Sequence, residues 1–352
     1  MMKTEDIEAL VRPNIRQLCP YSTARDEFSG KLGVFLDANE STYPTGWNRY
    51  PDPRQKELKA RIAPLKGVEP ENIFLGNGSD EAIDLVFRVF CIPGEDNVVA
   101  ISPSYGMYEV AADINDIALR HVQLRDDFSL PVEELLAACD AHTKAIFLCS
   151  PNNPSGNAIP NETVFSILER FNGMVVVDEA YIDFCSVPSL LPAVWRFPNL
   201  IVLQTFSKAR GMAALRLGMA FAQPYTIRLM SMVKYPYNIN ESTQRLALEA
   251  LEKPIDREVA EIVAQRIRLV HKFLRYTCIR RVFPSEANFL LVKVDDADAL
   301  YSHLISDGII VRNRTRVPGC KDCLRITVGL PEENDRLLKS LDRYEKESHL
   351  RR

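Results

Sequence analysis

The chain has 352 residues, of which 46% are hydrophobic and 26% are charged, so it can bury a large core and form one large domain with a smaller one, or two comparable domains. The formal net charge of −4 argues against a protein that binds nucleic acid or anionic lipid through an overall basic surface. The acidic start MMKTEDIEAL does not resemble a secretion signal, and no stretch is long and apolar enough to span a membrane. We therefore expect a cytoplasmic protein.

The eight cysteines are scattered along the chain, which predicts free thiols. Only Cys320 and Cys323 form a CxxC pair. A zinc site needs more ligands than this pair offers, and none of the five histidines is close to it in sequence. We predict no metal site, and we favour packing over a redox role for the pair.

Residues 1–45 lack a regular strand pattern, and we assign them to the smaller domain. From residue 46 to residue 240, short apolar runs alternate with amphipathic stretches, which predicts a large α/β domain. Several runs are apolar throughout, as expected for strands that helices cover on both faces. The prediction is a mainly parallel seven-stranded sheet with strands at 72–76, 98–102, 119–124, 144–149, 174–178, 200–206 and 217–222. In such sheets, ligands bind beyond the carboxyl ends of the strands.

The first strand leads into the run GNGSDE at residues 76–81. Gly76 and Gly78 permit a tight turn, and the backbone amides near Ser79 and Asp80 would open a helix, where a phosphate group can bind. The structural alternative is a simple helix cap with Ser79 or Asp80 as the N-cap residue. The run alone does not decide between these interpretations.

Two further strands end in suggestive motifs. SPSYGMY at 102–108 offers the ring of Tyr105, which could stack on a planar cofactor, although an aromatic side chain after a strand more often belongs to the core. LCSPNNPSG at 148–156 holds Asn153 in a turn of Asn and Pro residues, and a purely structural turn is the default interpretation.

MVVVDEAY at 174–181 places Asp178 at the end of an apolar strand. A buried carboxylate is costly unless it is paired, and the protonated nitrogen of a pyridine ring is a partner that would keep both groups charged. Tyr181 and Asn153 could then bind the phenolate oxygen of the same ring. The structural alternative is an Asp that caps the next helix.

The segment Thr205-Phe206-Ser207-Lys208 follows the sixth strand, and Arg216 comes eight residues after Lys208. A lysine can hold the aldehyde of pyridoxal phosphate as a Schiff base, while Ser207 and Arg216 would bind the cofactor phosphate. Alone, a Ser-Lys pair in a surface turn is usually only solvated. Together, the strand ends offer a phosphate loop, a stacking ring, an Asn, an Asp with a Tyr, a Lys and an Arg, and this order predicts a pyridoxal phosphate site.

The pattern changes in residues 241–352, which we assign to a small C-terminal α+β domain. A long helical stretch, about 241–276, precedes the short predicted strands 289–294, 308–313 and 323–329.

This set of motifs resembles the fold type I pyridoxal phosphate enzymes, in which Asp178 would match the partner of the pyridine nitrogen and Lys208 the Schiff-base lysine. Over nearly the whole chain, the resemblance narrows to the histidinol-phosphate aminotransferase family. The motifs that carry it are PYSTARDEF (20–28), LDANESTYPTG (36–46), RYPDP (49–53), SPSYGMY, DEAYIDF (178–184), TFSKA (205–209) and CLRITVG (323–329).

The resemblance implies transamination of L-histidinol phosphate with 2-oxoglutarate, giving imidazole acetol phosphate and glutamate, a step of histidine biosynthesis. It implies that Lys208 is also the general base and that Tyr50 of the partner subunit reaches the cofactor phosphate, so the active unit would be a homodimer. Tyr21, Arg312 and Arg325 would hold the anionic end of the substrate, because arginine forks suit both phosphate and carboxylate. A threonine-phosphate decarboxylase or an aromatic amino acid aminotransferase of the same fold is the alternative.

Two positions near the lysine depart from the family pattern. Ala214 stands where the family more often has a glycine, and Arg210 stands where it more often has an apolar residue. An alanine so close to Arg216 could shift the phosphate contacts.

Overall fold

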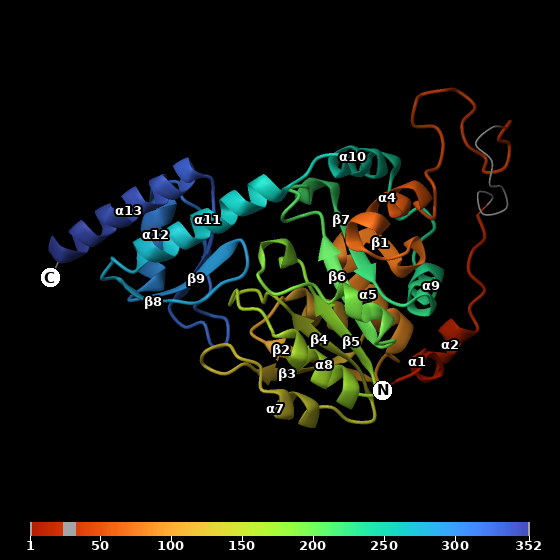
Figure 1. The fold of residues 1–352 in the computed structure, drawn as a ribbon, viewed down its shortest axis with the longest axis horizontal. Coiled ribbons are helices and arrows are strands. Elements are labelled where there is room, and N and C mark those ends of the chain that lie inside the picture. Colours follow the sequence, from red (N-terminus) through yellow and green to blue (C-terminus); the bar gives the residue numbers. More distant parts are fainter. Residues whose placement is uncertain (1, 24–32, 351–352) are drawn as a thin grey trace.

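The computed structural model describes residues 2–23 and 33–350, which form two domains around two separate sheets (Figure 1). The larger sheet has seven strands: β1 (Ile73–Asn77), β2 (Asn97–Ser102), β3 (Ala118–Gln123), β4 (Thr143–Cys149), β5 (Met174–Asp178), β6 (Leu200–Thr205) and β7 (Leu217–Phe221). All seven coincide with predicted strands to within one residue at each end. The predicted α/β fold with a seven-stranded, mainly parallel sheet is confirmed.

The strand order of the large sheet is β1-β7-β6-β5-β4-β2-β3. Strands β2 to β6 run parallel to their neighbours among themselves, whereas β7 is antiparallel to both β1 and β6. The carboxyl ends of β4, β5 and β6 therefore lie at one edge of the sheet, which is where an open α/β sheet binds its ligands.

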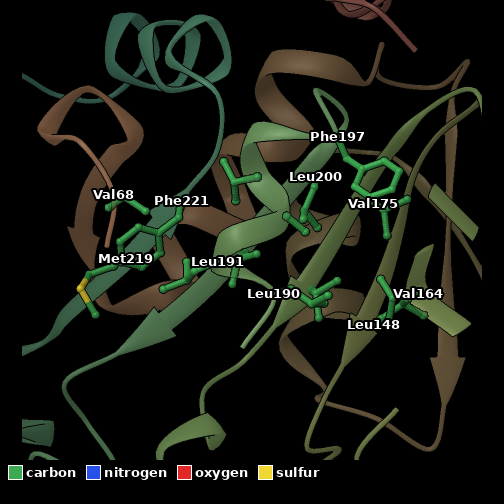
Figure 2. Close-up of a cluster of buried hydrophobic side chains, with 14 of the residues drawn as sticks. Val68, Leu148, Val164, Val175, Leu190, Leu191, Phe197, Leu200, Met219 and Phe221 are labelled. Carbon is green, nitrogen blue, oxygen red and sulfur yellow. The ribbon is translucent and has the colours of Figure 1, made fainter. Parts of the chain in front are cut away.

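The strands of the large sheet bury both of their faces, since alternate side chains point to opposite sides. In β5, Val175 and Val177 belong to one hydrophobic cluster, whereas Met174 and Val176 belong to the cluster on the other face. Figure 2 shows side chains of the first cluster gathered between the sheet and its covering segments, among them Val175 and Val164. This double burial explains why these strands read as continuous apolar runs.

Helices cover both faces of the large sheet. Those contributing to the first cluster are α4 (Lys56–Lys66), α7 (Val132–Ala137), α8 (Asn161–Arg170) and α10 (Glu241–Leu251). Those contributing to the second are α1 (Thr4–Leu10), α2 (Pro13–Arg16), α5 (Gly78–Phe90), α6 (Met107–Ile114) and α9 (Pro224–Val233). None of the described helices combines the length and the apolar character needed to cross a bilayer.

The prediction that the N-terminal segment joins the smaller domain is wrong for the described residues of that segment. Ile7 of α1 and Ile15 of α2 are buried in the second cluster of the large domain, and Val11, between them in the sequence, is buried in the same cluster. Val11 is extended and ends α1, so the two short helices bury Ile7 and Ile15 separately, and this burial places the segment on the large domain. Figure 1 also shows residues 33–45 on the side of the large domain opposite the smaller one.

The smaller domain packs α11 (Asp256–Phe273), α12 (Ala297–Ser306) and α13 (Pro331–Leu350) against a four-stranded sheet of order β10-β11-β9-β8. Its strands are β8 (Ile279–Val282), β9 (Phe289–Val294), β10 (Arg312–Asn313) and β11 (Cys323–Thr327). The prediction missed β8, and it made β10 too long. The backbone amides of Asp307, Gly308 and Ile309 donate hydrogen bonds to carbonyls in the last turn of α12. The pairing of β10 with β11 therefore starts only at Arg312.

The predicted helical stretch after residue 240 is two helices that belong to different domains. Helix α10 packs on α4, and Ala247 and Leu251 are buried in the large-domain core, whereas α11 carries Leu269 and Phe273 into the smaller core. The break falls at Lys253-Pro254, where proline prevents a continuous helix. By core packing, the smaller domain starts at α11 and not at residue 241.

Candidate active site

A cavity of about 1070 Å³ lies at the carboxyl edge of the large sheet, and residues of both domains line it. It brings together most of the predicted site residues, which come from distant parts of the sequence. They are Ser79, Asp80, Tyr105, Asn153, Asp178, Tyr181, Ser207, Lys208, Arg216, Arg312 and Arg325.

One end of the cavity is suited to an anion. Helix α5 begins there at Gly78, whose φ of +73° is accessible to glycine, and its first turn presents the amides of Ser79 and Asp80. Ser207 and Arg216 line the same cavity from the loop after β6 and the turn before β7. The partial positive charge of the helix terminus adds to that of the guanidinium, so a phosphate group would fit here.

Gly218 of β7 lies directly behind this anion-binding turn. A Cβ at position 218 would come within 3.0 Å of the backbone of both Gly78 and Ser79. We expect Gly218→Ala to lower the free energy of unfolding by about 1–3 kcal/mol and to weaken phosphate-bearing cofactor binding about tenfold, since the turn must move. Thermal unfolding of the cofactor-free protein and a cofactor titration measure the two effects.

The matched control for the effect of Gly218→Ala on the free energy of unfolding is Gly106→Ala; because Gly106 lines the cavity, it does not serve as a control for cofactor binding. A Cβ at position 106 meets no atom within 4 Å, and Gly106 is exposed. Equal free energies of unfolding for Gly218→Ala and Gly106→Ala would show that the turn at Gly78 and Ser79 tolerates displacement.

The carboxylate of Asp80 organises the side of the cavity. It accepts a hydrogen bond from the hydroxyl of Tyr105 at 2.9 Å and another from the Arg216 guanidinium at 3.0 Å. Burial, followed by the charge of Asp80, raises the pKa of Tyr105 far above its ordinary value, so this hydroxyl stays protonated. The Tyr105 ring, held by its hydroxyl, presents a planar surface beside the anion-binding end.

Asp178 lies at the floor of the cavity, at the end of β5, and is 3% exposed. Burial raises the pKa of its carboxyl to about 6, although hydrogen bonds from the Tyr108 hydroxyl at 3.0 Å and the Ala180 amide at 3.1 Å oppose that rise. No described cation bonds the carboxylate. A protonated ring nitrogen in the cavity would supply the missing positive partner.

Lys208 follows β6, and its amine lies over the ring of Tyr181, 5.6 Å from the ring centroid. Burial and then the positive charge of Arg325 lower the pKa of Lys208. The lowered pKa increases the fraction of free amine, which is the form that acts as a nucleophile or a base. Burial also raises the pKa of Tyr181, which keeps that hydroxyl available as a donor.

Asn153 connects the two domains across the cavity. Its amide oxygen accepts a hydrogen bond from the Arg325 guanidinium, and this contact leaves the Asn153 NH2 group as the donor for a ligand oxygen. Arg325 of β11 lies directly opposite Arg312 of β10 in the antiparallel register. The two guanidiniums therefore enter the same end of the cavity from neighbouring strands.

The structure does not bring Tyr21 or Tyr50 to this cavity. Tyr21 is 76% exposed and lines a second cavity of about 800 Å³, and residues 24–32, which follow it, lie outside the described residues. Tyr50 is 50% exposed and stacks on Tyr237 at a centroid distance of 4.4 Å. Their roles stay predictions, because within one chain neither side chain reaches Lys208.

The two departures near the lysine fall in different places. Arg210 points away from the main cavity, toward the end of α10, where its guanidinium donates to the Ala250 carbonyl at 3.3 Å. Ala214 lies in the short helical turn Ala213–Leu215, directly before Arg216, whose backbone is left-handed with φ of +53°.

Sequence reasoning missed three residues that line the cavity. Tyr108 is fully buried and bonds Asp178; its position one helical turn after Tyr105 was the available signal. Arg314 and Arg316 also line the cavity, and the signal there was the repeat of an arginine at every second residue from Arg312 to Arg316.

A model of the aminotransferase class I and II family matches residues 33–341. The chain belongs to the class I and II aminotransferases. It is 55% identical to the histidinol-phosphate aminotransferase of Parabacteroides distasonis, over 96% of this chain and 98% of the relative. Identity to the enzyme of that name from Bacteroides fragilis is 52%, over 98% of this chain and 100% of the relative. The predicted resemblance to this family is confirmed.

A solved structure agrees with this placement. The crystal structure of histidinol-phosphate aminotransferase from Sinorhizobium meliloti in complex with pyridoxal-5'-phosphate matches with a TM-score of 0.78 and 25% identity, over 86% of this chain and 85% of that chain. This aminotransferase therefore has the fold of type I pyridoxal phosphate enzymes.

The residues present suit the standard cofactor of class I and II aminotransferases. The helix terminus and Arg216 match a phosphate, the planar Tyr105 matches an aromatic ring, and the buried carboxylate of Asp178 forms no ion pair with any described cation. The amine of Lys208 lies in the same cavity and completes the set.

Proposed function

We propose that this aminotransferase transfers the amino group of L-histidinol phosphate to 2-oxoglutarate, giving imidazole acetol phosphate and glutamate in histidine biosynthesis. The observation that carries the proposal is the pairing of Arg312 with Arg325 on facing strands, in the cavity that also holds Lys208. The names of the close relatives point to the same reaction.

The cofactor of the proposal is pyridoxal 5'-phosphate, which supplies an aldehyde that bonds the substrate amine and a ring that accepts the electron pair released at the substrate Cα. Ser79, Asp80 through its amide, Ser207 and Arg216 would hold its phosphate. Tyr105 would stack on its ring, Asp178 would pair with its nitrogen, and Asn153 with Tyr181 would donate to its phenolate oxygen.

Lys208 is the general base in this proposal. Its amine takes the proton from the substrate Cα, and the lowered pKa of Lys208 favours the free amine that this step requires. Arg325 contributes to that lowered pKa through its positive charge. Arg325 therefore acts both on the substrate anion and on the base.

The two arginines account for the use of two different substrates. Histidinol phosphate has a phosphate but no α-carboxylate, whereas 2-oxoglutarate has carboxylates only. The planar forks of Arg312 and Arg325 can bind either kind of anion. The same subsite can therefore serve both halves of the reaction.

The test is a half-reaction. With histidinol phosphate alone, the visible absorption band of the bound cofactor should disappear as the cofactor takes up the amino group, and added 2-oxoglutarate should restore it. Loss of carbon dioxide from phosphothreonine, without amino transfer from histidinol phosphate, would instead identify a threonine-phosphate decarboxylase. A faster half-reaction with aromatic amino acids than with histidinol phosphate would identify an aromatic aminotransferase.

The proposal includes a cytoplasmic homodimer in which Tyr50 of each chain reaches the cofactor phosphate of the other. The half-exposed Tyr50 ring, outside the cavity of its own chain, supports this arrangement, since a second chain could receive its hydroxyl.

A further inference from the structure

The main cavity contains more positive charge than the proposed reaction has so far used. Arg314 and Arg316 line it beside Arg312 and Arg325. Within the described part of the chain, no carboxylate forms an ion pair with any of these four guanidiniums.

Strand geometry directs Arg314 into the cavity. Arg312 pairs with Arg325 in the antiparallel register, and the Arg314 amide continues this ladder by donating to the Cys323 carbonyl at 2.8 Å. Side chains two residues apart on a strand share a face, so Arg314 lies on the same face as Arg312. The tight turn closed by the bond from the Val317 amide to the Arg314 carbonyl, at 2.8 Å, then fixes its position.

Arg314 is the member of this group whose charge is least compensated. It is half-buried, and its Nε is buried without a hydrogen-bond partner among the described residues. Burial, followed by the charge of Arg312, lowers the pKa of Arg314. An unpaired, partly desolvated guanidinium is costly unless a ligand supplies the anion.

A buried arginine elsewhere in the chain shows how such a charge is otherwise compensated. Arg266 of α11 is 8% exposed, and it donates to the carbonyls of Phe184 at 3.3 Å and Ala287 at 2.8 Å. It also lies 3.6 Å from the carboxylate of Glu286. Among the residues that the structure describes, Arg314 has no comparable set of acceptors, which distinguishes a binding residue from a structural one.

We propose that Arg314 is a specificity-determining residue that binds the phosphate group of the substrate, together with Arg312 and Arg325, and so favours a phosphate monoester over a carboxylate. This inference rests on the proposed function. A carboxylate has one charge and two oxygens, which two arginine forks satisfy, whereas a phosphate monoester at pH 7 carries a charge of roughly −1.5 to −2 on three oxygens. The third guanidinium therefore contributes mainly when a phosphate is bound.

The kinetic test compares Arg314→Gln with the control Arg281→Gln, which removes the same charge from the exposed face of β8 in the same domain. Arg314→Gln should raise KM for histidinol phosphate roughly 10- to 100-fold while changing kcat and the KM for glutamate, measured in the reverse direction, by less than about threefold. Arg281→Gln should change none of these. An equal rise in both KM values, or no rise for histidinol phosphate, would overturn the proposal.

A binding measurement does not depend on turnover, and because it is read from thermal unfolding it also shows whether each variant is folded. Inorganic phosphate should raise the thermal unfolding temperature of the cofactor-loaded wild-type enzyme and of Arg314→Gln, but Arg314→Gln should need roughly tenfold more phosphate. Arg314→Lys, which keeps the charge but loses the fork, should fall between them. The same phosphate dependence in all three proteins would contradict the role of Arg314, whereas a wild type that binds phosphate but does not react with histidinol phosphate would contradict only the proposed function.

Discussion

Lys208→Ala should lower kcat of the amino transfer by about 10⁴-fold and remove the visible absorption that depends on the bond between the lysine and the cofactor. The physical reason is that one amine both tethers the aldehyde and carries the proton of the substrate Cα. No other described lysine lines the main cavity, so no second amine can replace it. Absorption spectra and steady-state rates measure the two effects.

The charge-matched control is Lys339→Ala, which removes an exposed amine from α13. It should leave both the spectrum and kcat unchanged. A small primary amine added to Lys208→Ala should restore part of the rate, because it can accept the Cα proton in place of the missing side chain. An unchanged spectrum in Lys208→Ala would refute the assignment of this lysine.

Asp178→Asn should lower kcat by about 10³-fold. The amide keeps the size of the side chain and can still accept from the Tyr108 hydroxyl, but it carries no charge with which to hold a proton on the ring nitrogen. Loss of one partner of a buried ion pair costs about 3–5 kcal/mol, which corresponds to this factor. Single-turnover kinetics with histidinol phosphate would isolate the proton-transfer step.

The same substitution should have the opposite effect on the stability of the cofactor-free protein. Folding raises the pKa of Asp178 from 3.8 to about 6, so the native state favours the protonated carboxyl. The carboxylate therefore costs little stability below about pH 4, and its cost grows to about 3 kcal/mol as the pH rises through 6. Asp178→Asn removes this dependence.

Denaturant unfolding of the cofactor-free wild type and of Asp178→Asn at pH 4 and pH 7 measures this pH-dependent difference in the free energy of unfolding. The stability advantage of Asp178→Asn over wild type should increase by roughly 2–2.5 kcal/mol between the two pH values, because the carboxylate already has a small cost at pH 4. Asp113→Asn, which removes an exposed carboxylate from the same helix as Tyr108, is the control. A constant difference across this pH range would mean that Asp178 does not titrate as proposed.

The central sheet could be predicted because double burial makes its strands apolar throughout. The same logic failed for β8, whose sequence IRRV alternates exposed arginines with half-buried aliphatic residues and offers no apolar run. The N-terminal pattern of Ile7, Val11 and Ile15 was visible in the sequence as an amphipathic spacing. The core that receives it was not visible, because periodicity identifies a face but not its partner.

The site could be predicted where a residue type is chemically unusual at the end of an apolar strand, as with Asp178 and Lys208. The position of Tyr108 three residues after Tyr105 was a weak signal, because an aromatic residue on a helix is ordinary core until its hydroxyl is placed against a carboxylate. Arg314 was missed for a similar reason. Its spacing of two from Arg312 predicts a shared face only if both residues follow one strand, and the register of β10 with β11 is what shows that they do.

The contact between Tyr181 and Phe289 has a consequence for how this enzyme can be tuned. Their rings meet edge to face at 5.2 Å, and the Arg325 guanidinium lies 5.3 Å from the Phe289 ring centroid. Tyr181 follows β5 of the large domain, and Phe289 lies on β9 of the smaller domain beside Arg325, so this aromatic contact lies where the two domains meet at the cavity. Under the proposed function, a substitution at Phe289 would change the position of Arg325 relative to Lys208 while leaving unchanged the residues proposed to hold the cofactor.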